Sequence, residues 1–495
     1  MAEIDGATLV ARCLKQQGID ELFGVVGIPV TGIALAAPGE GIRYVGMRHE
    51  QAAGYAAQAI SYMKGRIGAC IVVSGPGMTN AISALGNAWS NCWPMLLIGG
   101  SSNQIFNHMG DFQAAPQVEL ARPFCKWVGQ AERLEHIPRY IATAVRLAIS
   151  GRPGPVYLDL PGDIIMSRID ESKIDYPPRV EAPPTPTVDP ALIKKALGIL
   201  RSARQPLAII GKGAAWARAE EQVRRFIDET HLPFLASPMG KGVVPDDHPL
   251  SVAAARTYAL QNADLVFLIG ARLNWIMHFG LPPRFRKDLR VVQLDIAAEE
   301  IGTNVPTEVP LVGDAKAVMT QMVAALEEDP WQVSASSPWR QGLQKEIDAK
   351  RAATVPLLES DDVPMNYYRP LQEIQDALPR DAIIVTEGAM VVLIIKPDDH
   401  GGIFGQLDQQ GVKTSHAMAP EHFDLVPEHL AVNDLGIAGG KNTVPQQTHL
   451  LQEGGRGGDH AVQPVLPIGP RPHHAGLLVM KAPDHIIPHP LRMGV

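Results

Sequence analysis

The stretch IGACIVVSGPGMTNAISALGNAWSNCWPMLLIGG, residues 67–100, decides the fold. It begins with an apolar run typical of a buried strand, turns at SGPG, continues with helical spacing and ends in a second apolar run. No Asp, Glu, Lys or Arg occurs from Ile67 to Gly110. The polar turns interrupt the about 20 continuous apolar residues that a membrane span needs. We therefore expect strand, helix and strand, with the strands buried on both faces of a parallel sheet.

The same alternation extends to both sides of this stretch. A helical pattern, two apolar strands and an Ala-rich helix precede it, and the strand PVYLDLPGD follows it. Strands that alternate with helices predict a parallel α/β sheet with right-handed crossovers. Prolines favour extended spacers, so YPPRVEAPPTPTVDP, residues 176–190, predicts a linker that ends a first domain at residue 175.

The α/β rhythm restarts after the linker. A second domain is predicted over residues 191–345, with the segments ALIKKALGILRSA, PLAIIGKGA, EEQVRRFIDET, LVFLIGAR, RVVQLDI and AKAVMTQMVAALEE. A third begins over residues 346–389, with NYYRPLQEIQDAL and DAIIVTEGA. The predicted fold class is α/β, built from successive parallel-sheet domains.

After residue 389 the composition changes. Residues 390–495 hold 10 of the 16 histidines, contain no Trp or Tyr, and include only VVLIIK and AGLLVM as strand-like runs. Such a segment has little apolar area to offset the entropy lost on ordering. We expect a truncated third domain followed by an irregular, disordered or loosely structured tail.

Composition excludes some partners. A net charge of −8 offers no basic surface for nucleic acid. The four cysteines lack the spacing of a metal site, which favours a reduced, cytoplasmic location. Glu3 and Asp5 stand where a signal peptide would be basic, so we expect none, and no membrane partner.

Three motifs each follow a predicted strand: GIPV (27–30), RHEQ (48–51) and SGPG (74–77). Parallel sheets bind ligands at the carboxyl ends of their strands. Glu50 is the carboxylate among these turns. A carboxylate in the first turn of a helix is stabilised by about 0.3–1 kcal/mol through the helix dipole, so helix-start chemistry alone is one interpretation. No Gly-x-Gly-x-x-Gly opens a helix after a strand, which argues against a dinucleotide site.

In this order, the motifs resemble the thiamine-diphosphate-dependent decarboxylases and lyases, and above all the 2-hydroxyacyl-CoA lyases and oxalyl-CoA decarboxylases. The resemblance covers residues 7–389 almost without gaps and includes the stretches FGVVGIPVTGIA, GMRHEQAAGYAA, VVSGPGMTNAI, GDFQAAPQVE, GRPGPVYLDLPGD, PMGKGVVPDDHP and GARLNWIMHFGLPPRF. It implies cleavage of a 2-hydroxyacyl-CoA to formyl-CoA and an aldehyde. The alternatives are an oxalyl-CoA decarboxylase, or a non-catalytic α/β protein that binds a nucleotide or CoA.

The resemblance also implies roles for residues of the first domain. Glu50 matches the glutamate that hydrogen-bonds the aminopyrimidine ring of the coenzyme and favours the tautomer whose own nitrogen takes the C2 proton. The turn Gly27, Ile28, Pro29 and Val30 matches the segment near the pyrimidine. Phe112 and Gln113 match a loop that reaches the reaction centre. Oxalyl-CoA decarboxylases usually carry Tyr at the Phe112 position and lyases carry Phe, which favours the lyase.

A second site is implied at positions that hold ADP in oxalyl-CoA decarboxylases: Arg152, Gly211, Lys212, Arg272, Asp295 and Asp314. Lys and Arg suit phosphates, and an Asp at a strand end suits a ribose hydroxyl. Ordinary surface ion pairing is the alternative interpretation for each residue.

The third domain departs from the family pattern. Family members hold the diphosphate through Mg²⁺, bound by the Asp of a Gly-Asp-Gly segment and a later Asn. This sequence has no Gly-Asp-Gly; GGDH (457–460) is the nearest string, and no suitable Asn follows it. We predict no metal ligands here and expect the chain as written to be inactive. A frame shift or splice variant near residue 390 is the simplest hypothesis. Family members form homodimers or homotetramers, and the same assembly is in question for this chain.

Overall fold

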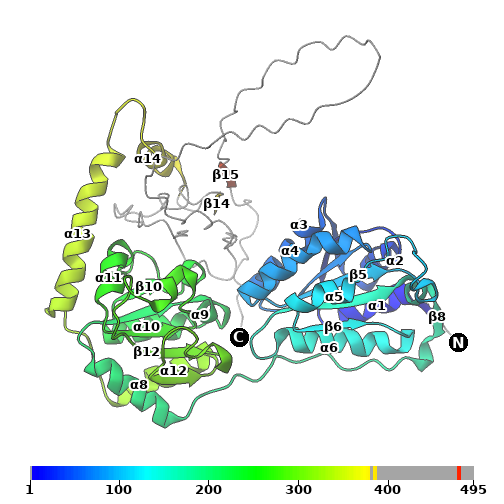
Figure 1. The fold of residues 1–495 in the computed structure, drawn as a ribbon, viewed down its shortest axis with the longest axis horizontal. Helices are drawn as coiled ribbons and strands as arrows, with labels where there is room; N and C mark the ends of the chain where they lie inside the picture. The colour runs from blue at the N-terminus through cyan, green and yellow to red at the C-terminus, as the bar shows by residue number, and fades with distance from the viewer. Residues whose placement is uncertain (1–2, 380–382, 387–476, 481–495) are drawn as a thin grey trace, which may run out of the picture.

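The computed structural model describes residues 3–379, 383–386 and 477–480. Two α/β units are connected by the Pro-rich segment (Figure 1). Residues 174–189 form neither helix nor strand, as the proline content predicts. Both units consist of a parallel sheet between layers of helices, so the predicted fold class is confirmed.

The first unit is built on a six-stranded sheet. Its order is β3-β2-β4-β5-β7-β6, and every pair is parallel. The strands are β2 (Glu21–Val25), β3 (Arg43–Gly46), β4 (Gly68–Val72), β5 (Met95–Ser101), β6 (Trp127–Gln130) and β7 (Pro155–Pro161). A separate antiparallel pair joins β1 (Glu3–Asp5) to β8 (Arg168–Asp170).

Alternation along β5 fixes the two faces of this sheet. Leu96 and Ile98 pack with the helix layer of α1 and α6, while Met95 and Leu97 pack with α3 and α4 on the opposite face. These helices are labelled in Figure 1. Because both faces are covered, the strand carries no polar side chain from Met95 to Gly100, as the uncharged stretch predicts. The helices are α1 (Gly6–Gln16), α2 (Thr31–Ala36), α3 (Glu50–Lys64), α4 (Pro76–Asn91), α5 (Gln117–Ala121), α6 (Ile137–Ile149) and α7 (Gly162–Met166).

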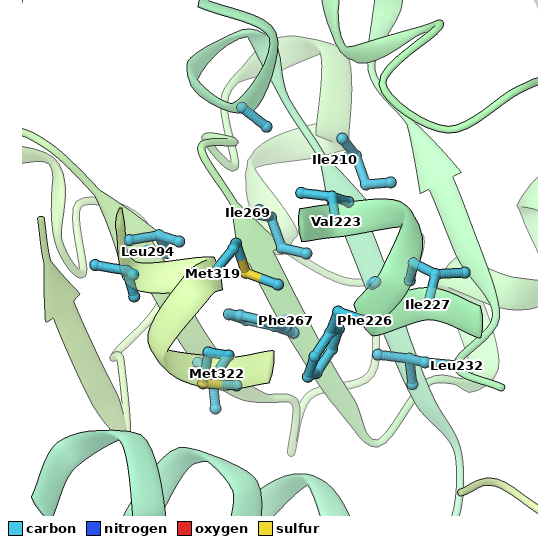
Figure 2. Packing of buried hydrophobic residues seen from close by; sticks show 14 of the residues in the cluster. Ile210, Val223, Phe226, Ile227, Leu232, Phe267, Ile269, Leu294, Met319 and Met322 are labelled. Atoms are coloured by element: carbon cyan, nitrogen blue, oxygen red, sulfur yellow. The ribbon is translucent and has the colours of Figure 1, made fainter. Parts of the chain in front are cut away.

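The second unit has a five-stranded parallel sheet in the order β10-β9-β11-β12-β13. Its strands are β9 (Pro206–Ile210), β10 (Phe234–Ala236), β11 (Leu265–Ile269), β12 (Arg290–Asp295) and β13 (Val309–Val312). Figure 2 shows the core under α10 (Glu220–Thr230) and α12 (Ala315–Glu328). Here the rings of Phe226 and Phe267 pack edge to face, with their centroids 5.9 Å apart. Full burial of one such ring stabilises the fold by about 1.5–3 kcal/mol.

The opposite face of this sheet packs against α13 (Pro338–Leu358). Trp339 and Leu343 of this helix are buried there, and the indole Nε1 donates to the carbonyl of Pro206 at 2.9 Å. The predicted boundary at residue 345 therefore lies within a helix that begins in the second core. The other helices of the unit are α8 (Pro190–Ser202), α9 (Lys212–Trp216) and α11 (Arg256–Asn262).

The structure describes part of the predicted third domain. α14 (Tyr368–Ala377) covers most of the predicted helix, and β14 (Ile383–Thr386) pairs antiparallel with β15 (Leu477–Met480). Residues 477–480 of the strand-like run AGLLVM thus form a strand. The remainder of the predicted tail lies outside the described residues. Within the described ranges, no helix is long and apolar enough to cross a membrane.

Candidate functional site

Three predicted motifs lie along one edge of the first sheet. The turn 27–30 follows β2, RHEQ follows β3 and SGPG follows β4, and these three strands are neighbours in the sheet. Because the strands are parallel, all three turns leave from the carboxyl edge. We call Glu50, these turns and residues 111–113 the Glu50 site.

Glu50 is the first residue of α3. His49 caps the helix, with Nδ1 accepting from the Gln51 amide at 3.1 Å. The Glu50 carboxylate is half-buried, and Oε2 accepts from Asn80 Nδ2 at 3.0 Å. The carboxylate therefore lies beside the first turns of two helices, because Asn80 belongs to the start of α4. Helix-start stabilisation and a site role are compatible here.

Space beside the carboxylate depends on Gly77. An ideal Cβ on Gly77 would lie 3.6 Å from Glu50 Oε1 and 2.5 Å from Val73 Cγ1. A side chain at this position would displace Val73 and extend toward the carboxylate. The SGPG turn therefore keeps the approach to Oε1 open.

The SGPG turn also contacts the loop that carries Phe112 and Gln113. Gly75 has a φ of 58°, and a Cβ there would lie 2.6 Å from the carbonyl oxygen of Gln113. Ser74 Oγ donates to Gln113 Oε1 at 3.3 Å. Gln113 is thus packed against the turn, whereas the Phe112 side chain is 67% exposed. Phe112 is therefore not a buried core aromatic.

A buried polar network that sequence reasoning missed lies beneath the site. The Gln117 amide accepts from the Gly75 N–H at 2.6 Å and donates to Asp159 Oδ2 at 2.9 Å. Tyr157 donates to the same oxygen at 2.8 Å, and burial with the neighbouring Asp159 raises the pKa of Tyr157 well above its ordinary value. The network ties the turn at the start of α4 to the end of β7.

The turn 27–30 and segment 105–112 form the outer rim of the Glu50 site. Val30 is fully buried, while the Ile28 side chain is 73% exposed. Pro29 packs against β5 so closely that a Cβ on Gly100 would lie 2.7 Å from its ring. Further exposed apolar side chains belong to segment 105–112, namely Ile105, Phe106, Met109 and Phe112. The four residues predicted for this turn are thus near the Glu50 edge, with Ile28 presented outward.

A second cavity, of about 250 Å³, lies between the two units, and we call it the inter-unit pocket. Its lining joins the end of α4, the loop 149–153, the linker prolines 183–186 and the carboxyl ends of β11 and β12. Five of the six residues predicted for a nucleotide line it: Arg152, Lys212, Arg272, Asp295 and Asp314. Arg152 belongs to the first unit and the other four residues to the second, so both units line the pocket.

Gly211 does not line the pocket. It is buried where β9 ends, and a Cβ on it would lie 2.2 Å from the Gly270 carbonyl oxygen. Its absent side chain permits the close approach of the two strand ends, which is a packing role. Asp314 lines the pocket and also caps α12, because its Oδ1 accepts from the Ala317 amide at 2.9 Å.

The pocket cations contact both units. Lys212 Nζ donates to the Ser90 carbonyl at 2.8 Å and to Asn91 Oδ1 at 3.2 Å. Arg272 donates to the same carbonyl at 3.1 Å, so both cations lie at the C-terminal end of α4, where the helix dipole favours positive charge. Burial raises the pKa of Asp295, which accepts from the Ala297 amide at 2.9 Å.

Glu300 is a pocket residue that sequence reasoning missed. It forms an ion pair with Arg152 and lies 3.5 Å from Arg272 Nη1. The ion-pair interpretation of these arginines is therefore realised in the structure. The only sequence signal for Glu300 was its place five residues after Asp295, which is too weak to single it out.

Comparison with known proteins agrees with this geometry. Residues 4–120 match the thiamine pyrophosphate enzyme N-terminal TPP binding domain, and residues 193–322 match the central domain of the same enzymes. Human 2-hydroxyacyl-CoA lyase 1 is 47% identical over 387 residues, covering 78% of this chain and 67% of the relative. Oxalyl-CoA decarboxylase of Escherichia coli K12 is 40% identical over 393 residues, covering 78% and 69%.

The chain belongs to the thiamine pyrophosphate enzyme family. A third relative, 2-hydroxyacyl-CoA lyase of Arabidopsis thaliana, is 39% identical over 397 residues, covering 79% of this chain and 68% of its own length. The family resemblance and the coenzyme expected from the motifs are thereby confirmed. The chain's first family domain contains the Glu50 site, and its central family domain supplies most of the cations of the inter-unit pocket.

Proposed function

We propose that the Glu50 site is the coenzyme-activating half of a thiamine-diphosphate-dependent carbon–carbon lyase. The reaction is cleavage of a 2-hydroxyacyl-CoA to formyl-CoA and an aldehyde. The observation that carries the proposal is the Glu50 carboxylate, which Asn80 holds at the open carboxyl edge of the first sheet. The relatives named 2-hydroxyacyl-CoA lyase support this reading.

The residues of the Glu50 site fit the aminopyrimidine part of the coenzyme. Asn80 engages Oε2, and Gly77 leaves the approach to Oε1 open, so Oε1 is placed to exchange a hydrogen bond with a ring nitrogen. The exposed Ile28 and Phe112 offer apolar surface beside it. When bound, thiamine diphosphate supplies the electron sink for the carbon–carbon bond that breaks.

The diphosphate half of the site is the point at which this chain departs from the family pattern. We propose that Mg²⁺ would have to bridge the diphosphate to oxygen ligands, and the sequence contains no Gly-Asp-Gly segment to supply them. Without that anchor, the positioning contribution to the barrier, of order 7–11 kcal/mol at best, is lost. The chain as written is therefore proposed to be inactive by itself.

The test compares the chain with a chimera in which residues 390–495 are replaced by the diphosphate-binding domain of a lyase relative. The chain alone should show neither micromolar binding of thiamine diphosphate with Mg²⁺, measured by calorimetry, nor formyl-CoA release. The chimera should show both. Turnover by the unmodified chain would refute the proposed inactivity, and a folded, coenzyme-bound chimera without lyase activity would count against the proposed reaction.

Glu50 can be tested in the same chimera. Glu50→Gln should reduce turnover by far more than tenfold, because a neutral amide cannot take part in proton exchange with the ring nitrogen. Glu119→Gln is the matched control, since Glu119 is an exposed glutamate of α5 near the site. Turnover of Glu50→Gln within tenfold of the parent would remove Glu50 from this role.

The substrate alternative is oxalyl-CoA, as the decarboxylase relative indicates. The exposed phenyl ring of Phe112 at the rim favours the lyase, because a Tyr would present a hydroxyl to the reacting atoms. Assaying the chimera with both substrates decides between them.

A second proposed function is nucleotide binding in the inter-unit pocket. The convergence of Arg152, Lys212 and Arg272 with the half-buried Asp295 carries it, because guanidinium and ammonium groups suit phosphates and a carboxylate suits a ribose. ADP should raise the melting temperature of the full chain, and CoA is the alternative ligand. The double variant Lys212→Ala with Arg272→Ala should abolish the shift, whereas Arg286→Ala, which removes an exposed pair with Asp288, should retain it.

Exposed apolar side chains at the rim of the Glu50 site bear on the oligomeric state of the chain. Ile28, Ile105, Met109 and Phe112 are each at least 67% exposed, which is unusual for large apolar side chains gathered at one edge. We propose that this rim is covered by a second copy, as in a homodimer, and light scattering at increasing concentration tests it. The cytoplasmic location stays a prediction.

A further inference from the structure

Two arginines of the inter-unit pocket meet a carboxylate of the protein itself. Arg152 comes from the loop before β7 and forms an ion pair with Glu300, whose Oε1 also lies 3.5 Å from Arg272 Nη1. The three side chains are between 17% and 26% exposed, so water screens their interaction only partly. A single carboxylate oxygen thus lies between the two guanidinium groups that would receive a phosphate.

The position of Glu300 is fixed by its surroundings. It ends the short helix η9 (Ala298–Glu300), and its carbonyl accepts from Gln293 Nε2 at 3.1 Å and Thr303 Oγ1 at 2.9 Å. Gln293 is only 4% exposed and also accepts from the Gly302 amide at 3.0 Å. These contacts hold the backbone of the segment, so its carboxylate is delivered to the arginines by the fold.

Arg152 is held from a second side as well. Its Nε donates to Cys92 Sγ at 2.9 Å, while its Nη1 pairs with Glu300. The guanidinium is therefore already engaged in two directions. An anion that enters the pocket must replace the carboxylate at Arg152 and Arg272 or share them with it.

We propose that Glu300 competes with ligand phosphates for Arg152 and Arg272, and thereby sets how strongly the inter-unit pocket binds nucleotides according to their charge. This inference rests on the nucleotide site proposed above. A carboxylate and a phosphate are both acceptors for the planar guanidinium fork, so only one occupies a given pair of N–H groups at a time. The carboxylate also repels a phosphate that approaches the same pair.

Glu300 could instead help the ligand to bind, and the expected change in affinity on its removal then has the opposite sign. If the carboxylate mainly orders the two arginines for the ligand, its removal weakens binding. If it competes with the ligand, its removal strengthens binding, and the gain grows with the negative charge on the ligand. The sign of the change therefore separates the two roles.

The experiment is calorimetric titration of the full chain with ADP, AMP and adenosine. Glu300→Gln keeps the size of the side chain and removes its charge, and we expect it to bind ADP about tenfold tighter, the scale of one charge-assisted hydrogen bond. The gain should be smaller for AMP and absent for adenosine. Glu299→Gln, at the exposed neighbouring position, is the matched control and should bind all three like the parent.

Each outcome decides the question. Equal or weaker ADP binding by Glu300→Gln, with the parent binding ADP, overturns the competition and leaves the nucleotide site standing. ADP binding by the variant alone supports the competition, whereas no binding by either chain overturns both proposals. Should Glu300→Gln fail to fold, Glu300→Asp, which retracts the carboxylate by one methylene, is expected to bind ADP more tightly than the parent; unchanged or weaker binding overturns the competition.

Discussion

Some individual side chains stabilise the folded chain, and others lower its stability. Asp295 belongs to the second kind, because burial raises its pKa above 3.8. A carboxyl group whose folded pKa is raised favours folding fully only below its ordinary pKa, and that contribution is lost as the pH rises through the folded value. At a pH above the folded pKa, where the group is charged, the buried carboxylate therefore lowers stability. Such a group in a pocket agrees with the nucleotide site proposed above.

Asp295→Asn should raise the melting temperature at pH 7, and the gain should shrink as the pH falls toward 4. Asp288 makes the opposite control, because the hydrogen bond from Arg286 lowers the pKa of Asp288 and its charge supports folding at neutral pH. Asp288→Asn should lower the melting temperature at pH 7. Calorimetry across this pH range measures both, and a pH-independent gain for Asp295→Asn contradicts the argument.

The four cysteines should differ in reactivity. Burial raises the pKa of Cys13 and of Cys125 to about 12, and it also raises the pKa of the fully buried Cys70. At pH 8 a thiol of pKa 12 is about one part in ten thousand thiolate, the nucleophile that displaces iodide from iodoacetamide. Cys92 is partly exposed in the inter-unit pocket and should react first in the native chain. Peptide mapping by mass spectrometry reads this out, and saturating ADP should slow the reaction at Cys92.

At the scale of elements, α3 and α4 position the Glu50 site. Their first turns bring Glu50 and Asn80 together, and their close packing depends on Gly54. An ideal Cβ on Gly54 would lie 2.4 Å from Ala84 Cβ, so a methyl group there would push the helices apart. The approach of the two helices thus requires glycine at position 54.

Gly54→Ala should destabilise the chain despite the better helix propensity of Ala. Overpacking costs about 1–3 kcal/mol, against a propensity gain of at most about 1 kcal/mol. Gly198, exposed in α8 with nothing within 4 Å of an added Cβ, is the matched control. Gly198→Ala should stabilise by about 0.5–1 kcal/mol. Denaturant unfolding gives both values, and equal signs for the two would mean that α3 and α4 readily move apart.

For the whole molecule, the contact between the two units decides whether the inter-unit pocket exists. Besides Lys212 and Arg272 at the end of α4, Arg218 donates to the Tyr62 carbonyl at 2.6 Å and lies over the Tyr62 ring at 5.1 Å. Tyr62 in turn packs on Trp93 and Trp216, with ring centroids 5.1 and 6.2 Å apart. Both tryptophans line the pocket, so this cluster joins the units beside it.

Arg218→Ala should therefore uncouple the two units. Loss of a charged hydrogen bond and a cation–π contact costs about 1–2 kcal/mol. We expect a broader or split calorimetric transition, because the units would no longer unfold together. Arg225→Ala removes exposed pairs with Glu229 and Glu327 inside the second unit and should leave the shape of the transition unchanged. Indistinguishable transitions for the two variants would show that Arg218 does not couple the units.

The sequence by itself determined the fold class, the central strands and the position of Glu50. Strands such as β4 and β9 are buried on both faces and therefore apolar at every position, which makes them visible as runs. Within the two parallel sheets, the strands that the sequence missed are β6, β10 and β13, and all three are sheet edges. They have one partner and three or four residues each, and β13 contains a proline.

Only the tertiary structure decided which distant residues share a site. Asn80 is 30 residues from Glu50, and Glu300 is 148 residues from Arg152, so neither partner has a local pattern that announces it. Gly211 was predicted by resemblance to belong to the nucleotide site, yet the close strand ends require it for packing. Periodicity records which face of one element is buried, whereas a pairing between polar side chains depends on how separate elements meet, and that is fixed by packing of the whole chain.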